Sequence, residues 1–425
     1  MILIKGGRVV DPESGTDKKA DLVIEDGKIK EIGTVSDLSG YERVIDAEGC
    51  VVAPGLIDVH VHYRDPGLTY KEDIQTGAAA AKKGGYTTVV TMANTKPPVD
   101  NEETLRYVLE EGKKTGIHVL PAACITVGMK GQQLTDMEAL KAAGAAGFTD
   151  DGIPIMDGKL VKTAMEEAVR LDVPLSFHEE DPAFITENGI NAGETAGKLG
   201  ITGSPALAED SLVARDCMIA LHTGASVNIQ HISSGNAVKM VKLAKELGAH
   251  VTAEVTPHHF SLDETAVLTH GAMAKMNPPL RTAADRAAII EGIKDGTIDM
   301  IATDHAPHSA EEKAAEPMWK APSGIIGLET ALGLAVTNLV RPGHLTMLQL
   351  MEKMSLNPAK LYRLDKGSLA EGKDADLVIF NENESWTVTK EEIASRSCNT
   401  PFLGETLYGR VKYTICGGNI VYEDK

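Results

Sequence analysis

From residue 54 to residue 366, short apolar runs alternate with longer amphipathic segments, and this alternation constrains the fold more than any other feature. Segments with helical spacing include Asn101–Thr115, Lys159–Leu171, Ala206–His222, Gly235–Leu247 and Ala283–Asp295. The apolar runs with the length of buried strands are Leu56–Val61, Thr87–Met92, His118–Ala122, Gly147–Thr149, Val173–Phe177, Ser226–Gln230, His250–Glu254 and Asp299–Ala302. Strands that alternate with helices form parallel sheets, and eight such units are the number in a TIM barrel. We therefore predict an α/β protein with a (β/α)8 TIM barrel over residues 54–366.

The two ends of the chain have a different pattern, in which short strands are separated by Gly-Gly and Asp-Gly turn signals. At the amino-terminal end the strand-like runs are Ile2–Lys5, Arg8–Val10, Asp21–Glu25 and Lys28–Ile32. At the carboxyl-terminal end they are Asp376–Phe380, Val411–Ile415 and Asn419–Tyr422. We expect residues 1–53 and 367–425 to form one small β-sandwich domain built from both chain ends.

Charge and cysteine content argue against several classes of protein. A formal net charge of −19 repels a phosphate backbone, so we expect no nucleic-acid partner, and an anionic substrate would need cations supplied by the site itself. The five cysteines are scattered without a Cys-x-x-Cys pair, which argues against disulfides and against a cysteine zinc site. No apolar run approaches the ~20 residues of a membrane span, and Met1–Lys5 leads directly into a strand pattern. We therefore expect a cytoplasmic protein with no membrane partner.

Histidines and aspartates follow the predicted strands at the end where barrel active sites are built. The six candidates are His60, His62, Asp151, His178, His231 and Asp304. His60 and His62 are two residues apart on a strand, so both imidazoles point to one face. Imidazole and carboxylate ligands suit zinc, and also Mn, Co or Fe. Six ligands exceed the needs of one tetrahedral ion, which favours two ions bridged by Asp151, with Asp150 as the alternative bridge.

Other polar residues near these positions are candidates for binding or processing a substrate. Asp304 follows an apolar strand, and an aspartate beside a metal-activated water can take its proton and pass it to a leaving nitrogen. Arg64 follows His62 by two residues and offers a fork for a carboxylate. Asn94 and Asn277 are candidate amide donors. Such residues are also common in helix caps, turns and surface loops, so the pattern alone leaves both interpretations open.

Longer motifs carry a resemblance to known enzymes. The run from Pro54 to His62 resembles the opening metal motif of the amidohydrolase superfamily. The runs that look like the type I class of the bacterial dihydroorotase family are His62-Tyr-Arg64-Asp-Pro-Gly67, Asn94-Thr95, Phe148-Thr-Asp-Asp-Gly152, Asn277-Pro-Pro-Leu-Arg281 and Ala302-Thr-Asp-His-Ala-Pro-His308. The similarity covers nearly the whole chain, and the last two motifs together are specific.

The resemblance implies roles for single residues. It assigns one or two zinc ions to His60, His62, Asp151, His178, His231 and Asp304, and it gives Asp304 the acid/base role. It assigns the substrate to Arg64, Asn94, Asn277, His308, Ser323 and Gly324. Related hydantoinases bridge their metals with a carboxylated lysine, whereas this chain has Asp150-Asp151-Gly152 there, and ungapped similarity with His178 favours Asp151. Glu179, Ala93 and Ser323 depart from the residues usual in relatives, which are Cys, Pro and an aromatic residue.

The implied activity is the reversible interconversion of N-carbamoyl-L-aspartate and L-dihydroorotate in pyrimidine biosynthesis, a reaction on a small-molecule substrate. The resemblance leaves room for a homodimer and for association with aspartate carbamoyltransferase. One alternative is another cyclic amidohydrolase, such as an allantoinase or a hydantoinase/dihydropyrimidinase. The other is a non-catalytic barrel that serves as a scaffold for aspartate carbamoyltransferase. The polar stretch Ser309–Pro322 has two interpretations, a mobile lid or a plain surface loop.

Overall fold

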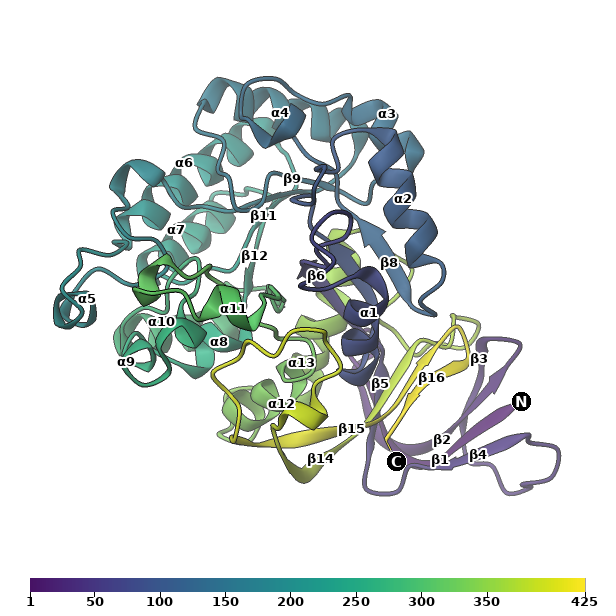
Figure 1. Ribbon diagram of the computed structural model, residues 1–425. Coiled ribbons are helices and arrows are strands. Elements are labelled where there is room, and N and C mark those ends of the chain that lie inside the picture. The colour runs from purple at the N-terminus through teal and green to yellow at the C-terminus, as the bar shows by residue number, and fades with distance from the viewer. Residues whose placement is uncertain (425) are drawn as a thin grey trace.

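Both ends of the chain contribute strands to one eight-stranded sheet in the computed structural model, which describes residues 1–424 (Figure 1). The amino-terminal strands are β1 (Ile2–Asp11), β2 (Thr16–Glu25), β3 (Lys28–Gly33), β4 (Arg43–Asp46) and β5 (Val51–Pro54). The carboxyl-terminal strands are β14 (Leu377–Thr387), β15 (Thr406–Cys416) and β16 (Asn419–Glu423). The order across the sheet is β16-β15-β14-β5-β1-β2-β3, with β4 paired to β1. Pairing of β5 with β14, in which Val52 lies opposite Ile379, joins the two ends.

Eight further strands run parallel to their neighbours in two sheets. The first sheet has the order β6 (Leu56–Val61), β7 (Tyr86–Thr91) and β8 (His118–Pro121). The second has the order β13 (Met300–Ile301), β12 (Val251–Val255), β11 (Val227–Ile229), β10 (Leu175–Phe177) and β9 (Phe148–Thr149). Each strand overlaps one predicted run and ends within two residues of its bounds. The predicted α/β organisation with parallel strands is confirmed.

Two isolated parallel bridges connect the edges of these sheets. Ala123, just after β8, pairs with Phe148 in β9, and the amide of Thr149 donates to the Ala123 carbonyl at 2.8 Å. At the opposite edges, Val61 in β6 pairs with His305, which follows β13, and the amide of His62 donates to the His305 carbonyl at 2.8 Å. The three-stranded and five-stranded sheets are therefore linked on both sides.

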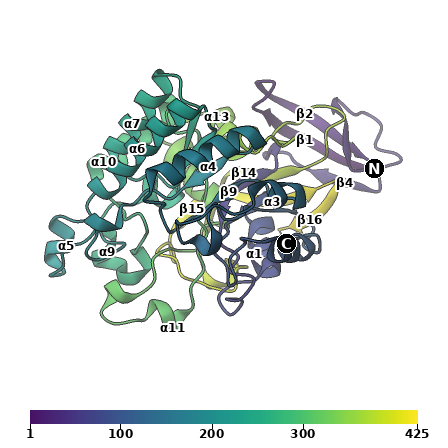
Figure 2. The same cartoon turned by 90° about the horizontal axis from the view of Figure 1, so that it is seen from above.

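The helices lie between successive parallel strands or follow the last of them. They are α1 (Ile74–Lys83), α2 (Glu102–Gly112), α3 (Met137–Ala143), α4 (Gly158–Leu171), α5 (Glu194–Lys198), α6 (Leu207–Thr223), α7 (Gly235–Glu246), α8 (Pro257–Ser261), α9 (Ala266–His270), α10 (Ala283–Asp295), α11 (Ala310–Lys313), α12 (Ala331–Ala335), α13 (Met347–Met351) and α14 (Asn357–Leu361). Neighbouring helices α4, α6, α7 and α10 pack side by side along one flank (Figure 2). The five predicted helices correspond to α2, α4, α6, α7 and α10.

Close packing fixes the first helix against the segment that carries the histidine pair. Gly77 in α1 lies over the ring of Tyr63, and a Cβ at that glycine would lie only 2.3 Å from a ring atom. Tyr63 is 2% exposed and follows His62 directly, so this contact holds the end of β6 in place. A side chain larger than hydrogen at residue 77 would displace the ring, because a packed core has no spare volume there.

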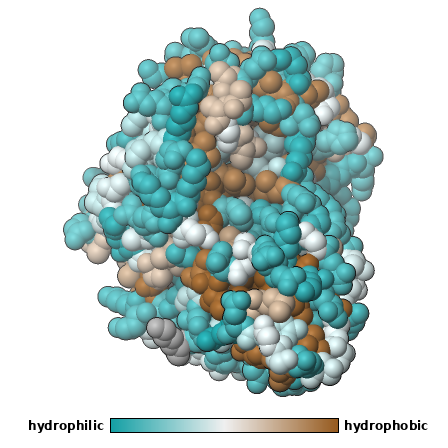
Figure 3. All heavy atoms as spheres, turned by 90° about the vertical axis from the view of Figure 1, so that its right-hand side faces the viewer, coloured by the Kyte–Doolittle hydropathy of each residue, from teal (hydrophilic) through white to brown (hydrophobic). Residues whose placement is uncertain are grey.

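One face of the molecule is mostly polar (Figure 3). Figure 3 shows the right-hand side of Figure 1, where hydrophilic residues cover most of the face and apolar ones gather in a band along its middle. Over residues 1–424, no helix combines the length and apolar character needed to cross a membrane.

Candidate metal centre

The six histidines and aspartates singled out from the sequence meet at the carboxyl ends of the parallel strands. His60 and His62 lie at the end of β6, Asp151 follows β9, His178 follows β10, His231 follows β11 and Asp304 follows β13. All six are buried, with at most 7% of each residue exposed. The strands of a parallel sheet end at one edge, which is why residues far apart in sequence come together here.

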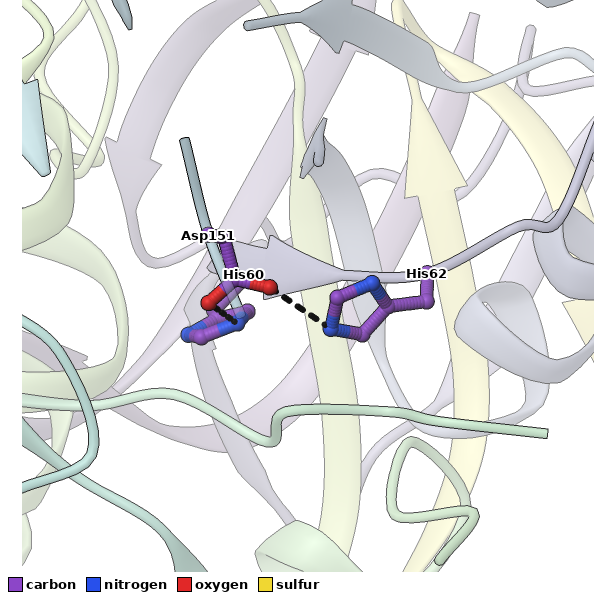
Figure 4. Close-up of side chains that lie close together, drawn as sticks. All are labelled: His60, His62 and Asp151. Carbon is purple, nitrogen blue, oxygen red and sulfur yellow. Dashed lines mark ion pairs between the residues drawn. The ribbon is translucent and has the colours of Figure 1, made fainter. Parts of the chain in front are cut away.

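Asp151 is the centre of this cluster. Its Oδ1 lies 3.3 Å from Nε2 of His60, and its Oδ2 lies 3.4 Å from Nε2 of His62 (Figure 4). The same Oδ1 lies 3.8 Å from Nδ1 of His178 and 3.9 Å from Nε2 of His231. Both histidine pairs have Asp151 as their third candidate ligand. One carboxylate between two pairs of imidazoles is an arrangement that can bridge two ions.

The donor atoms of the cluster fit divalent cations. Nε2 of His60 and Oδ1 of Asp151 are buried, and neither has a hydrogen-bond partner within the described residues 1–424. Nδ1 of His178 and Nε2 of His231 lie 2.9 Å apart, so two ring nitrogens face each other. Buried polar atoms without partners are costly, and imidazole nitrogen with carboxylate oxygen is a donor set suited to zinc, manganese or cobalt. The residues present therefore fit a metal.

Negative charge surrounds the imidazoles. Burial lowers the pKa of His60, but the carboxylates of Glu254 and Asp151 raise it by more than burial lowers it. The pKa therefore lies well above its ordinary value. Burial also lowers the pKa of His178, and the carboxylates of Glu180, 3.1 Å away, and Asp151 reverse this shift. At these two residues the pocket stabilises positive charge, which also favours a bound cation. Burial, and then the charges of His178 and His60, instead lower the pKa of His231 well below its ordinary value.

Asp150, the alternative bridge, turns away from the histidines. Its Oδ1 accepts hydrogen bonds from the amides of Ile125 at 2.8 Å and Thr126 at 3.1 Å. Its Oδ2 accepts from the hydroxyl of Thr126. Of the two neighbours, which lie at the turn after β9, only Asp151 faces the cluster.

Two residues orient the histidine pair through the ring nitrogen that faces away from Asp151. Oε1 of Glu254, in β12, lies 2.5 Å from Nδ1 of His60, and Oδ1 of Asn94 lies 2.9 Å from Nδ1 of His62. Such contacts fix the tautomer and the ring orientation of metal-binding histidines. Sequence reasoning assigned Asn94 to the substrate alone and missed Glu254. The signal for Glu254 is a glutamate at the end of an apolar strand run.

A cleft of about 550 Å³ opens over the cluster. The residues that the resemblance assigned to the substrate all line it: Arg64, Asn94, Asn277, His308, Ser323 and Gly324. Among the described residues that line the cleft, Arg64 is the one permanent cation. Its Nε donates to the carbonyl of Pro307 at 3.3 Å. The cleft therefore combines a guanidinium with the histidine and aspartate cluster, in a protein whose overall charge repels anions.

Three residues of the site have left-handed backbone conformations, which non-glycine residues rarely adopt. The φ angles are 58° at Arg64, 33° at His231 and 49° at Asp304. Asp304 uses this conformation while its Oδ1 lies 3.0 Å from Nε2 of His62. Backbone of this kind costs about 1–3 kcal/mol per residue and persists where the surrounding structure enforces it.

Known proteins match the chain along nearly its whole length. A Dihydro-orotase-like family model matches residues 49–237, and an Amidohydrolase family model matches residues 278–422. The dihydroorotase of Clostridioides difficile strain 630 is 61% identical over 99% of this chain and 100% of its own length. The dihydroorotase of Clostridium acetobutylicum is 54% identical over 100% of both chains.

The chain belongs to the dihydroorotase family. It is accordingly a cyclic amidohydrolase, which confirms the resemblance found in its motifs.

Solved structures of other amidohydrolases share the architecture of this dihydroorotase-family chain. L-hydantoinase (dihydropyrimidinase) from Arthrobacter aurescens has a TM-score of 0.88 and 26% identity, covering 99% of this chain and 96% of that one. D-hydantoinase (dihydropyrimidinase) from Thermus sp. has a TM-score of 0.86 and 26% identity, covering 100% and 96%. Since dihydroorotases and hydantoinases share this fold, residues of the site must separate their activities.

The three departures from the dihydroorotase family pattern lie in different surroundings. Glu179 is 3% exposed and does not line the cleft; burial and then the charge of Asp216 raise its pKa well above the ordinary range. Ala93 is fully buried and its carbonyl accepts from the amides of Thr95 and Val99. Ser323 lines the cleft. Of the three, only Ser323 borders the space where a substrate would bind.

Hydrogen bonds made by the segment Ser309–Pro322, and one donated to it by Lys275, constrain its position. Ser309 caps α11, and Nζ of Lys313 donates to the carbonyls of Pro322 and Gly324, both at 2.9 Å. Nζ of Lys275 donates to the carbonyl of Ala321 at 2.6 Å. These bonds hold the segment beside the cleft, and the mobile-lid interpretation stays a prediction.

Proposed function

We propose that the protein is a metal-dependent dihydroorotase that interconverts N-carbamoyl-L-aspartate and L-dihydroorotate in pyrimidine biosynthesis. The observation that carries the proposal is the placement of Asp151 between two histidine pairs, below a cleft that contains Arg64. Relatives at 61% and 54% identity that are named dihydroorotase support the same substrate. A full set of candidate ligands argues against the non-catalytic scaffold.

We propose zinc as the metal, with one or two ions per chain. With two ions, His60 and His62 would hold one, His178 and His231 the other, Asp151 would lie between them, and Asp304 would be a further ligand. When bound, a divalent metal acts as a Lewis acid that lowers the pKa of water and polarises the carbonyl of the substrate.

The residues of the chain would then bind the ring and move its protons. Arg64 would hold the carboxylate of dihydroorotate and so place the ring amide over the cluster. During hydrolysis, Asp304 would take a proton from the attacking water and deliver it to the ring nitrogen as the bond between that nitrogen and C4 breaks. In the reverse direction Asp304 would remove a proton from the same nitrogen as its bond to C4 forms, and deliver it to the departing hydroxide, which leaves as water. Its position beside His62 and at the cleft wall fits both steps.

For the architecture, we propose that the eight parallel strands form a closed (β/α)8 TIM barrel over residues 54–366. The bridges from Val61 to His305 and from Ala123 to Phe148 support closure, because they connect both pairs of free edges. Residues 1–53 and 367–425 would form the second domain, with the β-sandwich arrangement as the finer expectation. The homodimer and the association with aspartate carbamoyltransferase stay predictions.

A hydantoinase or dihydropyrimidinase activity is the second candidate, because solved hydantoinases share the fold. The two candidates differ at the bridge, where this chain has Asp151, and at the cleft, where Arg64 offers a partner for a carboxylate that hydantoin and dihydrouracil lack. These differences favour dihydroorotate as the substrate.

The deciding experiment compares hydrolysis of dihydroorotate, dihydrouracil, hydantoin and allantoin by the purified protein, with elemental analysis of the same sample. We expect a strong preference for dihydroorotate, one to two equivalents of zinc or a similar divalent ion, loss of activity on chelation and recovery with zinc. A preference for dihydrouracil or hydantoin would move the protein to the hydantoinases. Full activity in metal-free protein would refute the metal site.

A further inference from the structure

Lys71 lies beneath the cleft wall and has no role in the site described above. It is buried, with 10% of its side chain exposed, and it follows the Arg64 loop just before α1. Nζ of Lys71 lies 3.3 Å from Nδ1 of His308 and 2.8 Å from Oε1 of Glu312 in α11. The hydroxyl of Tyr70 donates to the same Glu312 oxygen at 2.9 Å, which helps to fix this carboxylate.

The contacts of His308 determine which of its ring nitrogens carries the proton. A lysine ammonium is only a donor, so Nδ1 of His308 must accept and carry no proton. Nε2 of His308 lies 2.9 Å from the carbonyl oxygen of Ser323, which is only an acceptor, so Nε2 must carry the proton. Lys71 and Ser323 therefore select the same tautomer, and their contacts are shorter than those that favour the other one, from Arg64 NH2 to Nε2 at 3.4 Å and from Glu312 Oε2 to Nδ1 at 3.7 Å.

This tautomer places a hydrogen-bond donor at the cleft, next to another one. Nε2 of His308 lies 3.4 Å from NH2 of Arg64, and both residues line the cleft. The Nε2 proton is donated to the Ser323 carbonyl, so a carboxylate that binds Arg64 would have to share this donor with that carbonyl or replace it. Burial, and then the charges of Arg64, Lys71 and Lys313, lower the pKa of His308 to about 2, so the ring is neutral near pH 7.

We propose that Lys71 is a positioning residue that holds His308 with its proton on Nε2 beside Arg64, the two residues that the family resemblance assigns to the substrate. Lys71 acts through His308 and does not itself touch the substrate. Glu312 pairs with the Lys71 ammonium at 2.8 Å and so helps to hold it beside His308. The identity of the carboxylate rests on the proposed function, whereas the tautomer rests only on the contacts of Lys71 and Ser323.

Kinetics of the metal-loaded Lys71→Met variant test the functional part of this inference. We expect KM for dihydroorotate to rise ~10-fold with kcat changed by less than ~2-fold. Without Lys71, His308 no longer keeps its proton on Nε2, which weakens substrate binding and does not alter the groups around the reacting amide. Lys71→Arg and Lys71→Gln keep a donor and should recover part of the loss. Dihydrouracil, which lacks the carboxylate, should show no such rise. Lys353→Met is the matched control, since Lys353 is 5% exposed and donates to the Ile298 carbonyl away from the cleft.

A double-mutant cycle separates action through His308 from a general effect on the cleft. If Lys71 acts through His308, adding Lys71→Met to His308→Ala should raise KM no further. Additive effects, or an unchanged KM in a folded Lys71→Met variant, would overturn the inference. Metal content and thermal unfolding of each variant should accompany the kinetics, so that loss of metal or of fold is recognised.

Nitrogen NMR of histidine-labelled protein tests the tautomer without any activity. The His308 signals are identified as those missing in His308→Ala. We expect the wild type to show a protonated Nε2 and an unprotonated Nδ1, and Lys71→Met to show a mixture of tautomers. A wild-type proton on Nδ1, or the same tautomer in both proteins, would refute the role of Lys71. Failure of the wild type to hydrolyse dihydroorotate would instead refute the proposed function, and the NMR result would stand apart from it.

Discussion

Glu254 lies with Oε1 at 2.5 Å from Nδ1 of His60, and this contact fixes how His60 faces the rest of the site. The glutamate is fully buried, and its Oε2 accepts from Nδ2 of Asn228 at 2.8 Å. A carboxylate can only accept, so Nδ1 of His60 carries a proton and Nε2, which faces Asp151, is the nitrogen that a metal would bind. Glu254 in β12 is thus not one of the six candidate ligands, but it fixes the orientation of His60, a candidate ligand in β6.

Glu254→Gln should weaken metal binding. The amide can turn its nitrogen toward His60 and favour the opposite tautomer, in which Nε2 is protonated and cannot bind. Loss of such an orienting partner typically lowers metal affinity by ~10–100-fold. Competition with a chromophoric chelator measures the affinity. Glu329→Gln is a suitable control, since Glu329 is a buried carboxylate that accepts from the amides of Ala394 and Ser395. Equal affinities in both variants would contradict the role of Glu254.

The neighbours Asp150 and Asp151 should fail in different ways. Asp151→Ala removes the shared oxygen pair and should lower metal content while leaving the fold stable. Asp150→Ala leaves the amides of Ile125 and Thr126 without their acceptor, and should lower the free energy of unfolding by about 2–4 kcal/mol while metal content stays near that of the wild type. Denaturant titration and elemental analysis distinguish the two outcomes. The opposite pattern would make Asp150 the bridge. Since Asp151 needs no carboxylation, reconstitution should not depend on bicarbonate.

Asp304→Asn should reduce kcat in both directions. Asparagine tolerates the left-handed backbone at this residue, where φ is 49°, so the fold is retained, but the amide cannot accept and return a proton. A loss of ~10²-fold or more is expected when general acid/base transfer is removed. Rates must be compared at equal metal content, because Asp304 lies 3.0 Å from Nε2 of His62. Turnover near that of the wild type, with intact metal, would exclude Asp304 as the proton carrier.

Arg64→Met should change which substrate the enzyme prefers. A charge-assisted contact of about 1.5–3 kcal/mol corresponds to a ~10–200-fold fall in kcat/KM for dihydroorotate. Lysine at this residue should rescue only in part, since it lacks the planar fork. The fall should be much smaller for dihydrouracil, which is expected to be a very poor substrate throughout. The informative quantity is the ratio of kcat/KM for dihydroorotate to kcat/KM for dihydrouracil. If this ratio were the same in the wild type and in the variant, Arg64 would not bind the carboxylate.

Short-range patterns explain why the strands and the six candidate ligands could be predicted. The spacing of His60 and His62 is local, and the parallel strands bring every strand end to one edge. The choice between Asp150 and Asp151 required the three-dimensional contacts of both residues, because the sequence pattern alone does not show which side chain faces the cluster. In the structure, the contacts of Asp150 with Ile125 and Thr126 decide it.

The supporting residues were harder to find because their partners are remote in sequence. Glu254 is 194 residues from His60, and Lys71 is 237 residues from His308. A lysine in a polar loop resembles any solvated surface charge until its burial is known. Asn94 shows a related limit, since its motif suggested a substrate contact and its amide also joins His62 to Asp151.

The left-handed backbone at Arg64, His231 and Asp304 has a consequence for laboratory evolution. Glycine adopts φ angles of this kind without penalty, so glycine at any of these positions would release conformational strain. Selection for heat resistance alone would therefore favour the loss of groups that the chemistry needs. Thermostable variants that keep turnover should instead carry their substitutions away from the strand ends, in the outer helices or in the sheet formed by the two termini.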